Sequence, residues 1–306
     1  MQTFSSLHST MQKKIKKEVC IMLANGLGYK KIIKKLKERE ISISKGTLYY
    51  WCNKETKRFQ KNSFTPSPSK ELSYFIGVMF GDGCATEDKV NYDYSLRLDS
   101  IDKEFVEKFA FCVSKLLKKE KSYPIHKCKH FFSANIRSKE LHEFVKEIKT
   151  NFDKAKPFIE ESPADFIQGV ADSEGCPDLK TTPCFNILIC IANSTNYALL
   201  EYTKKLLKKK FLIDSKIYLT HESGETDSII NGRIITRTKD LYKLNITDFS
   251  NTKIFHSIIG FSIKRKQEKL KDAITIKNNY SNNSRLKEWK KLYKKLRNGR
   301  WKKYAL

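Results

Sequence analysis

Two segments of the chain repeat each other at a spacing typical of a small domain. Residues 72–83 form an apolar run ending in Gly-Asp-Gly, and residues 166–175 form a second apolar run ending in Asp-Ser-Glu-Gly. Because a glycine follows each of them, Asp82 and Glu174 occupy matched positions, 92 residues apart. Self-similarity at this distance seldom arises by chance, so the chain is expected to contain two related half-domains.

The segments that follow the two runs agree as well. A strand-like stretch begins 13 residues after each acid, as SLRL in the first repeat and ILICI in the second. An amphipathic helix then ends in Leu-Leu-Lys-Lys, at residues 116–119 and again at 206–209. Further strand patterns follow: HFFSANI in the first repeat, and IYLTHE and DLYKLNI in the second. This order predicts an α+β fold of two pseudosymmetric αββαββα half-domains, at residues 71–155 and 156–275.

Residues 1–60 carry apolar side chains at helical spacing in three short stretches. Asn25-Gly26 separates the first two, and a polar break at residues 42–44 precedes the third, Lys45–Trp51. The apolar positions of the first two helices are Ile15, Val19, Met22, Leu23, Ile32, Ile33 and Leu36. Three short helices in this order predict a helix-turn-helix DNA-binding module. Its DNA-facing residues would be Lys45, Thr47 and Tyr50. A helical cap with no role in DNA binding is the alternative.

The repeats are flanked by two segments of unusual composition. Residues 61–70, KNSFTPSPSK, contain two prolines and three serines, which predicts a semi-extended tether. Residues 276–306 are strongly basic, and a helix there would place its large apolar residues on one face. These residues are Leu286, Trp289, Leu292, Tyr293 and Leu296. Such a helix would dock by its apolar side; a freely solvated basic tail is the alternative.

The charge of the chain indicates a polyanionic partner. Sixty Lys and Arg against 34 Asp and Glu give a formal charge of +26 over 306 residues. An excess of this size opposes compaction by self-repulsion, so nucleic acid is the expected partner. No apolar stretch of about 18 residues is present, and we expect no contact with a membrane. The N-terminus lacks the apolar core of a secretory signal, and the eight cysteines form no CxxC pair. A cytoplasmic protein with reduced thiols is therefore expected.

The two repeated runs resemble the signature motifs of LAGLIDADG homing endonucleases. FIGVMFGDG (75–83) and FIQGVADSEG (166–175) correspond to the two motifs. NSTNYALLEYTKKLL and the later stretch SIIGFSIKRKQEKL are similar to the same family. The resemblance covers roughly residues 70–272. A single apolar helix ending in Asp-Gly is common, whereas two of them at domain spacing inside a repeat are specific.

The resemblance implies that the two motif helices pack side by side about a pseudo-two-fold axis. The small residues that would permit this approach are Gly77, Gly81, Gly169 and Ala171. Asp82 and Glu174 would then meet above the DNA and bind Mg²⁺ or Mn²⁺, with the backbone carbonyls of Gly81 and Ser173 as further ligands. Because two close carboxylates repel each other, such a pair is costly without bound cations. The longer side chain of Glu174 would make the two cuts unequal in rate.

The identity of the second acid depends on the glycine that follows it. Asp172 competes with Glu174 as the ligand, but Gly175 aligns with Gly83. This alignment identifies Glu174 as the counterpart of Asp82.

The resemblance also implies a basic residue near each scissile phosphate, where it would stabilise developing charge. Lys243 in DLYKLNI is our candidate in the second half, although a surface lysine on a DNA-facing strand explains it equally well. Its partner in the first half is left open between Arg97 and Arg137. Antiparallel strands fit the major groove, where alternate side chains reach bases or phosphates. The basic residues on or beside predicted strands are Arg97, Arg137, Lys216, Arg233, Arg237, Lys239 and Lys243.

The expected function is therefore a monomeric homing endonuclease that hydrolyses both strands of a long duplex DNA site. The chain has no splicing cysteine at its start and no His-Asn at its end, so a free-standing or intron-encoded enzyme is expected rather than a self-splicing intein. Two alternatives use the same fold. One is a DNA-binding regulator on an inactive nuclease scaffold, against which the retention of both acids argues. The other is an RNA maturase that assists intron splicing.

Overall fold

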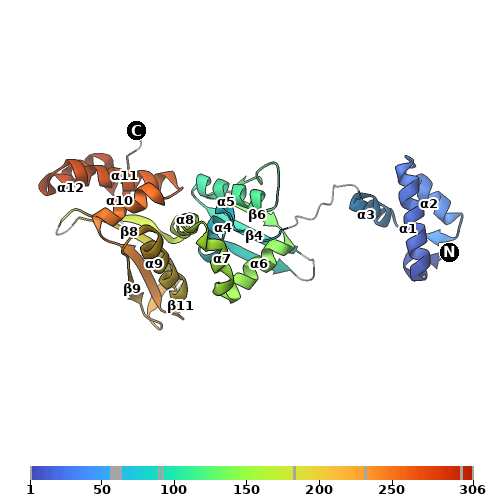
Figure 1. Cartoon of the computed structure of the whole chain (residues 1–306), viewed down its shortest axis with the longest axis horizontal. Helices are drawn as coiled ribbons and strands as arrows, with labels where there is room; N and C mark the ends of the chain where they lie inside the picture. The colour runs from blue at the N-terminus through green and yellow to red at the C-terminus, as the bar shows by residue number, and fades with distance from the viewer. Residues whose placement is uncertain are drawn as a thin grey trace. The chain divides into compact units, whose positions relative to one another are not determined.

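The computed structural model describes residues 2–55, 64–88, 90, 93–181, 184–230, 233–296 and 299–304. The chain divides into two compact units, Met1–Ser63 and Phe64–Leu306. Figure 1 shows the elements of each unit coloured along the chain.

The first unit contains the three helices expected from the sequence. They are α1 (Ser9–Ala24), α2 (Tyr29–Lys37) and α3 (Lys45–Glu55). A short 3₁₀ turn, η1 (Phe4–Ser6), precedes them, and β1 (Gln2–Thr3) pairs in parallel with β2 (Ile41–Ser42). Gly26, with φ of 78°, makes the left-handed turn after α1. The helices bury their apolar faces in a small core of their own: Ile15, Val19, Ile32, Leu36, Ile41, Ile43, Leu48 and Trp51.

From Phe64 onward, the segment 61–70 is not the free tether that its composition predicts. Residues 61–63 lie outside the described residues, whereas Phe64 is buried against Phe144 with ring centroids 5.3 Å apart. The Phe64 backbone N–H also donates to Glu140 Oε2 over 2.6 Å. A single aromatic side chain among prolines and serines thus anchors the segment to the second unit. Ser69 then caps the next helix by accepting from Leu72 N.

The first half-domain has the predicted order αββαββα. Its elements are α4 (Lys70–Phe80), β3 (Cys84–Asp88), β4 (Asp93–Ser100), α5 (Lys103–Leu116), β5 (His126–Lys127), β6 (Phe132–Arg137) and α6 (Lys139–Thr150). The strands form an antiparallel sheet in the order β3-β4-β6-β5. A 3₁₀ turn, η3 (Phe152–Ala155), and a short helix, α7 (Lys156–Glu160), lead to the second half.

The second half-domain repeats this order with one addition. Its elements are α8 (Pro163–Glu174), β7 (Cys176–Lys180), β8 (Asn186–Ser194), α9 (Tyr197–Phe211), β9 (Lys216–His221), β10 (Thr226–Ile230), β11 (Arg233–Thr236), β12 (Leu241–Ile246) and α10 (Phe249–Ile258). The main sheet has the equivalent order β7-β8-β12-β9. β10 and β11 form a separate hairpin between β9 and β12, in the place of the short β5–β6 connection of the first half.

Strand pairing defines which positions of the two sheets are equivalent. In the first sheet, Arg97 pairs with Cys84 on one side and Asn135 on the other. In the second sheet, Cys190 pairs with Cys176 and Asn245. In each sheet, these three paired residues form a row across neighbouring strands, and the first residue of the row lies two positions after a motif acid. Cys84 therefore corresponds to Cys176, Arg97 to Cys190 and Asn135 to Asn245.

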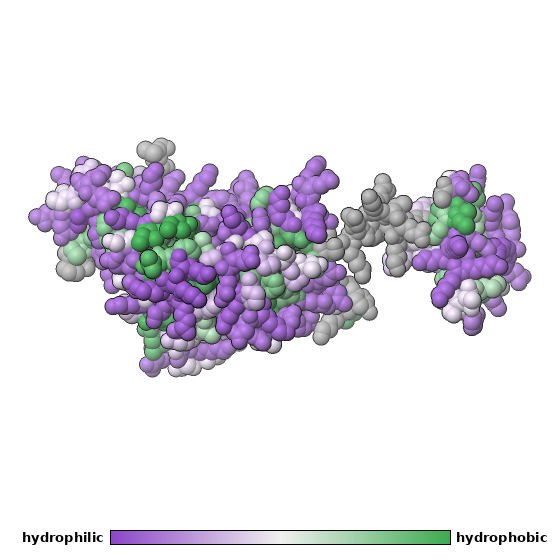
Figure 2. Space-filling model, viewed as in Figure 1, coloured by the Kyte–Doolittle hydropathy of each residue, from purple (hydrophilic) through white to green (hydrophobic). Residues whose placement is uncertain are grey.

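Each sheet has a helix-covered face and an open face. Side chains alternate along a strand, and Leu96, Leu98, Ala134 and Ile136 point into the core of the first half. Helices α5 and α6 pack on that face, and α8, α9 and α10 cover the second sheet. The opposite face of the first sheet carries exposed polar residues such as Arg97, Asn135 and Arg137. Figure 2 shows that most of the surface in view is hydrophilic.

The C-terminal segment folds as two helices and a hairpin. α11 (Lys264–Asn279) and α12 (Asn282–Leu292) are followed by β13 (Tyr293–Lys295) paired with β14 (Trp301–Lys303). The predicted apolar face is correct at its centre, because Trp289 is buried and stacks on Tyr293 at 3.9 Å. It is wrong at its end: the helix stops at Leu292, and Leu292 and Leu296 are exposed. Among the described residues, no helix is both long and apolar enough to cross a membrane.

Candidate active site

The motif helices α4 and α8 lie side by side between the two half-domains (Figure 1). They cross where two glycines face each other's backbone. A Cβ atom on Gly77 would lie 2.9 Å from Val170 N and still closer to Phe166 O. A Cβ atom on Gly169 would lie 3.1 Å from Val78 N and closer to Tyr74 O. Only glycine permits this backbone-to-backbone contact, which sets the distance between the halves.

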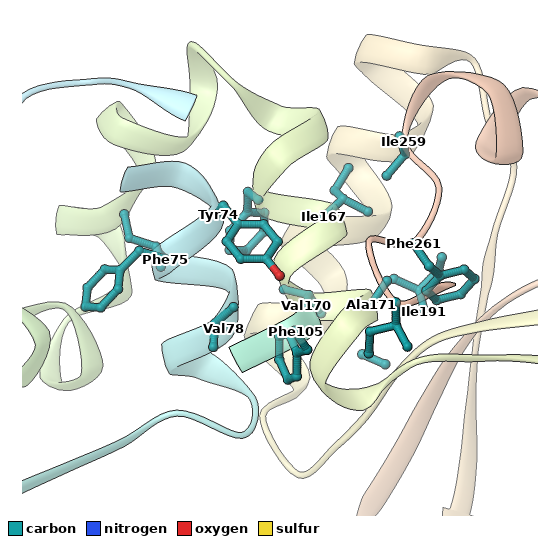
Figure 3. Packing of buried hydrophobic residues seen from close by; sticks show 14 of the residues in the cluster. Tyr74, Phe75, Val78, Phe105, Ile167, Val170, Ala171, Ile191, Ile259 and Phe261 are labelled. Atoms are coloured by element: carbon teal, nitrogen blue, oxygen red, sulfur yellow. The ribbon is translucent and has the colours of Figure 1, made fainter. Parts of the chain in front are cut away.

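Large apolar side chains surround the crossing point. Figure 3 shows Tyr74 of α4 reaching across to α8, with Val78, Ile167 and Val170 packed around it. All four side chains are at most 1% exposed. The helix ends are therefore held in place by a continuous core that both halves share.

The two acids meet at the C-terminal ends of these helices. Gly81 lies so close to α8 that a Cβ atom there would be 2.9 Å from Ser173 Oγ and 3.3 Å from Glu174 Cγ. Asp82 follows Gly81 directly, and its charge acts on Glu174. The structure thus brings together the two carboxylates that occupy matched positions in the repeat.

The surroundings make it difficult to ionise both acids. Burial is the larger cause, and the charge of Asp82 the second, of a rise in the pKa of Glu174 to about 7. Burial also raises the pKa of Asp82, although its carboxyl keeps access to solvent. Each acid lies at the negative end of a helix dipole, which opposes ionisation further. A cation is the natural counterpart of such a pair.

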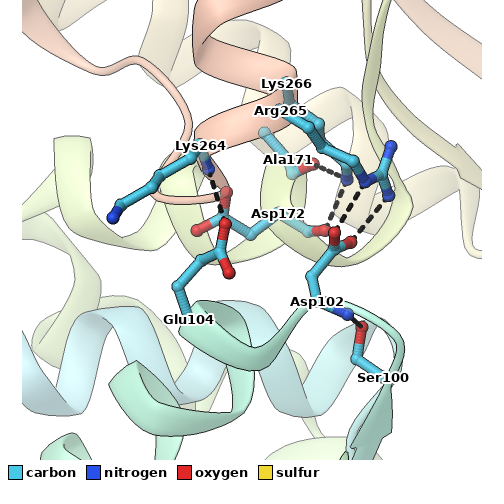
Figure 4. Close-up of polar contacts among 8 residues, drawn as sticks. All are labelled: Ser100, Asp102, Glu104, Ala171, Asp172, Lys264, Arg265 and Lys266. Carbon is cyan, nitrogen blue, oxygen red and sulfur yellow. Dashed lines mark hydrogen bonds and ion pairs between the residues drawn. The ribbon is translucent and has the colours of Figure 1, made fainter. Parts of the chain in front are cut away.

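A buried lysine supplies one positive charge at this place. Lys266, in the first turn of α11, is 6% exposed and donates from Nζ to Asp172 O over 2.6 Å and to Ala171 O over 3.3 Å (Figure 4). It thereby caps the C-terminal carbonyls of α8. Its charge lowers the pKa of both Asp82 and Glu174, against the larger effect of burial. Burial in turn lowers the pKa of Lys266 itself.

The residues before Lys266 attach α11 to the first half-domain. Arg265 makes a two-pronged contact with Asp102, with Nε and one terminal nitrogen each 2.6 Å from a carboxylate oxygen (Figure 4). The backbone N–H of Lys264 donates to Glu104 Oε1 over 3.0 Å. Asp102 and Glu104 belong to the start of α5, so the first turn of α11 touches both halves beside the acids.

Asp172 has a structural role in this arrangement. Its carboxylate is 1% exposed and accepts from Tyr74 OH over 2.9 Å and from Ser262 N over 2.9 Å, as well as from Ser262 Oγ. Burial raises its pKa. Through these contacts Asp172 links α8 to α4 and to the segment before α11, whereas Glu174 is the acid on which the charge of Asp82 acts.

The donors at the helix ends suit a hard divalent cation. Carboxylate and carbonyl oxygens are the ligands that Mg²⁺ prefers. The Ser173 carbonyl has no helical partner four residues on, because residue 177 is a proline without an N–H. In the described part of the chain no group of three or more His, Cys, Asp or Glu could hold a metal ion. A cation here would therefore be held by Asp82, Glu174, backbone carbonyls such as those of Gly81 and Ser173, and solvent.

Lys243 lies in β12, between β8 and β9 of the second sheet. It pairs with Asn193 and Tyr218, and its charge acts on Cys190. The position equivalent to Lys243 in the first half, two residues before Asn135, is Ser133. Neither Arg97 nor Arg137 is therefore its symmetry partner. Arg97 pairs with Asp99, and Arg137 with Asp93 over 3.0 Å.

The other residues predicted to bind DNA lie on strands, in the β10–β11 hairpin or on α3. Lys216 is exposed and pairs with Asn245 in the main sheet. Arg233 is exposed in β11, and Arg237 and Lys239 follow in the connection to β12. On α3 of the other unit, Lys45 and Tyr50 are exposed and Thr47 is half-buried at the capped start of the helix.

Sequence reasoning missed Lys266. Lys266 lies in SIIGFSIKRKQEKL, a stretch that is similar to the family. That similarity did not give a role to any single lysine of the stretch. Nothing in periodicity separates Lys266 from its basic neighbours Lys264, Arg265 and Lys269. Only the tertiary contact with the end of α8 does so.

Comparison with known proteins identifies the family. The LAGLIDADG-like domain matches residues 161–260. An uncharacterized protein of Methanocaldococcus jannaschii is 35% identical over 250 residues, which are 80% of this chain and 88% of that protein. The chain belongs to the LAGLIDADG family.

Further similarities are more distant or more partial. A probable translation initiation factor IF-2 of the same organism is 32% identical over 214 residues, which are 67% of this chain but 16% of that protein. Among solved structures, I-DmoI in complex with DNA and Mn is 20% identical, with a TM-score of 0.42, over 62% of this chain and 96% of that one. Full-length DUF199/WhiA from Thermatoga maritima is 18% identical, with a TM-score of 0.39, over 74% and 68% of the two chains.

Proposed function

We propose that this protein is a homing endonuclease that hydrolyses both strands of a long duplex DNA site with the help of Mg²⁺ or Mn²⁺. The observation that carries the proposal is the meeting of Asp82 and Glu174 at the ends of α4 and α8. Two carboxylates with raised pKa values, held together by glycine packing, are costly in a protein that does not use them. Bound divalent cations would offset that cost.

The residues around the acids would have different roles in the proposed reaction. Asp82, Glu174 and the carbonyls of Gly81 and Ser173 would hold the cations. When bound, such cations supply Lewis acidity and lower the pKa of bound water. The carboxylates would hold those cations, and the glycine-packed helix crossing would keep the two acids at a fixed separation. Because Glu174 is one methylene longer than Asp82, the two strands are expected to be cut at different rates.

Lys266 is a better candidate than Lys243 for the basic residue of the centre. Lys266 acts on both acids, whereas Lys243 lies in β12 of the second sheet. A buried ammonium group beside the two carboxylates would stabilise negative charge that develops on a phosphate. Lys243 would then contact a phosphate of the DNA backbone.

The open faces of the two sheets are the proposed DNA-binding surface. Antiparallel strands of this kind fit the major groove. The basic residues in or beside them are Arg97, Arg137, Lys216, Arg233, Arg237, Lys239 and Lys243. The three-helix unit, with Lys45, Thr47 and Tyr50 on α3, is proposed to be a helix-turn-helix module that adds a second contact to the same DNA. One chain carries both acids, so a monomer is sufficient.

The test begins with a target sequence. The Asp82→Asn, Glu174→Gln double variant is used to select bound duplexes from a randomised pool, and the wild-type protein is then assayed on them. We expect Mg²⁺-dependent cleavage of both strands by the wild type. Either single variant should lower the rate by roughly a hundredfold or more while leaving the Kd largely unchanged.

Glu107→Gln is the matched control, because this exposed glutamate lies on α5, which packs on the covered face of the first sheet. It should cleave as the wild type does. Binding without cleavage by the wild type, in Mg²⁺ and in Mn²⁺, would overturn the nuclease and leave a DNA-binding regulator on the same scaffold. Tight binding to structured RNA but not to any duplex would instead favour a maturase.

A further inference from the structure

Two cysteines stand opposite each other on the open face of the second sheet. Cys176 is the first residue of β7, and it pairs directly with Cys190 of β8. Directly opposed residues of antiparallel strands have Cα atoms about 4.5–5.5 Å apart. This separation falls inside the range of about 4.4–6.8 Å that a disulfide spans. Both side chains are free thiols, and the Cys190 thiol donates to the Ala192 carbonyl oxygen over 3.5 Å.

The two thiols differ in how far they are exposed. Cys176 is exposed, whereas Cys190 is only 6% exposed. A dissolved molecule therefore reaches Cys176 before Cys190. Cys190 is shielded from the same molecule but is already next to Cys176. An exposed attacking thiol backed by a buried resolving thiol is the arrangement that thiol–disulfide exchange requires.

Two lysines and one acid lie close enough to act on the exposed thiol. Lys269 and Lys266 of α11 lie near Cys176, with Asp178 as the nearby acid. Lysine side chains attract negatively charged oxidants to the thiol and reduce the repulsion between them. Oxidised glutathione carries such charge.

We propose that Cys176 and Cys190 form a reversible disulfide by exchange with a small-molecule disulfide. Cys176, after losing its proton to solvent, attacks one sulfur of the small disulfide, so that a mixed disulfide forms and one thiolate leaves. Cys190 then loses its proton and attacks the Cys176 sulfur, and the second small thiolate leaves. The two departing thiolates take up the two protons, so the protein dithiol is oxidised as the small disulfide is reduced. The proposal does not depend on nuclease activity.

The first half-domain provides an internal control. Cys84 occupies the position equivalent to Cys176 and is also exposed. The residue opposite Cys84 is Arg97, not a cysteine. Cys84 is therefore expected to stop at the mixed disulfide under the same conditions.

The test treats the full-length protein with oxidised glutathione, blocks remaining thiols and maps the peptides by mass spectrometry. The expected result is a crosslinked pair of peptides containing Cys176 and Cys190, together with a glutathione adduct on Cys84. Dithiothreitol should reverse both. Cys190→Ser should convert the crosslink into a glutathione adduct on Cys176. Because Cys190 is buried, Cys176→Ser is the second variant, and it should abolish the crosslink without any adduct on Cys190.

Two results would overturn the proposal. One is an adduct on Cys176 in the wild-type protein at the level found on Cys84, with no crosslink. The other is a crosslink of equal yield between Cys176 and a different cysteine.

Discussion

At the residue scale, the two candidate acids could be predicted from the sequence and Lys266, whose charge acts on both, could not. Asp82 and Glu174 stand at matched positions before glycines, so the repeat itself identifies them. Lys266 is one of several basic residues in its segment, and its role depends on a contact with the end of a helix almost a hundred positions earlier. A pattern within one element cannot reveal a contact between elements that are distant in sequence.

The raised pKa of Glu174 predicts a gain in stability when its charge is removed. Between its ordinary value near 4.5 and its folded value of about 7, the folded state keeps a proton that the unfolded state has released. The stability of the metal-free wild type should therefore fall as the pH rises through this window. Glu174→Gln should be more stable than the wild type at pH 8, by roughly 1–3 kcal/mol, and nearly equal to it close to pH 4.5.

Urea unfolding in the presence of a chelator measures this difference. Glu107→Gln, at an exposed position in α5, is the control and should show little change at either pH. A Glu174→Gln protein that is less stable than the wild type at pH 8 would contradict the interpretation of the acid pair as electrostatically costly.

Removal of the lysine charge should act on both acids at once. In Lys266→Met the pKa values of Asp82 and Glu174 rise further, because Lys266 lowers both. Cleavage at pH 7 is expected to fall by about a hundredfold, and the pH–rate profile should move to higher pH. Single-turnover rates over a pH series measure both effects. Lys243→Met serves for comparison, and an unshifted profile in Lys266→Met would argue against its proposed position in the centre.

At the scale of elements, the helices and strands of both halves follow from periodicity. The order αββαββα was predicted and is observed twice. Two features could not be predicted. A strand was predicted at β11, but its partner β10 was not, and the apolar residues Ile234 and Ile235 of the hairpin remain exposed, so burial does not mark it. The attachment of α11 to α5 depends on Arg265, Asp102 and Glu104, which belong to different halves.

The crossing of α4 and α8 predicts a strong effect for a very small substitution. Gly77→Ala would place a methyl group against the backbone of Phe166 and Val170, which cannot move aside as a flexible side chain does. The free energy of unfolding of the unit that contains both halves should fall by about 2–3 kcal/mol or more. Chemical denaturation followed by tryptophan fluorescence measures it.

Gly46→Ala is the matched control for this substitution. Gly46 lies in α3 of the other unit, and a Cβ atom there meets only Ser44 Oγ, at 3.6 Å. This change should be neutral or slightly stabilising, because alanine favours helix. A Gly77→Ala protein as stable as the wild type would show that the helices can separate without loss.

At the scale of the whole molecule, two separately folded units share a large positive charge. The boundary between them lies at Ser63 and Phe64, inside the segment expected to be a tether. Among the described residues, the small core of the first unit contains none from the second. Each unit is therefore expected to fold alone. The composition of residues 61–70 suggested a boundary between the units, and the two separate cores are the structural basis for independent folding.

Deletion of residues 1–63 separates the contributions of the two units to DNA binding. The remaining chain starts at Phe64, which keeps its packing on Phe144. Binding to the selected duplex should weaken, and the slope of log K against log salt should become smaller by about 0.9 for each DNA phosphate that the shortened protein no longer neutralises. Strand cleavage should persist at saturating protein. An unchanged slope would indicate that the three-helix unit is a cap without a role in DNA binding.

The buried carboxylate of Asp172 has a consequence for protein engineering. It accepts hydrogen bonds from Tyr74 of the first half and from Ser262, which precedes α11 in the sequence. Because the carboxylate is buried, water cannot take the place of these donors. A chimera that takes one half from a different member of the family would separate this trio and leave an unpaired acid in the shared interior. Grafts that transfer Tyr74, Asp172 and Ser262 as a set should therefore succeed more often than grafts that exchange the surfaces alone.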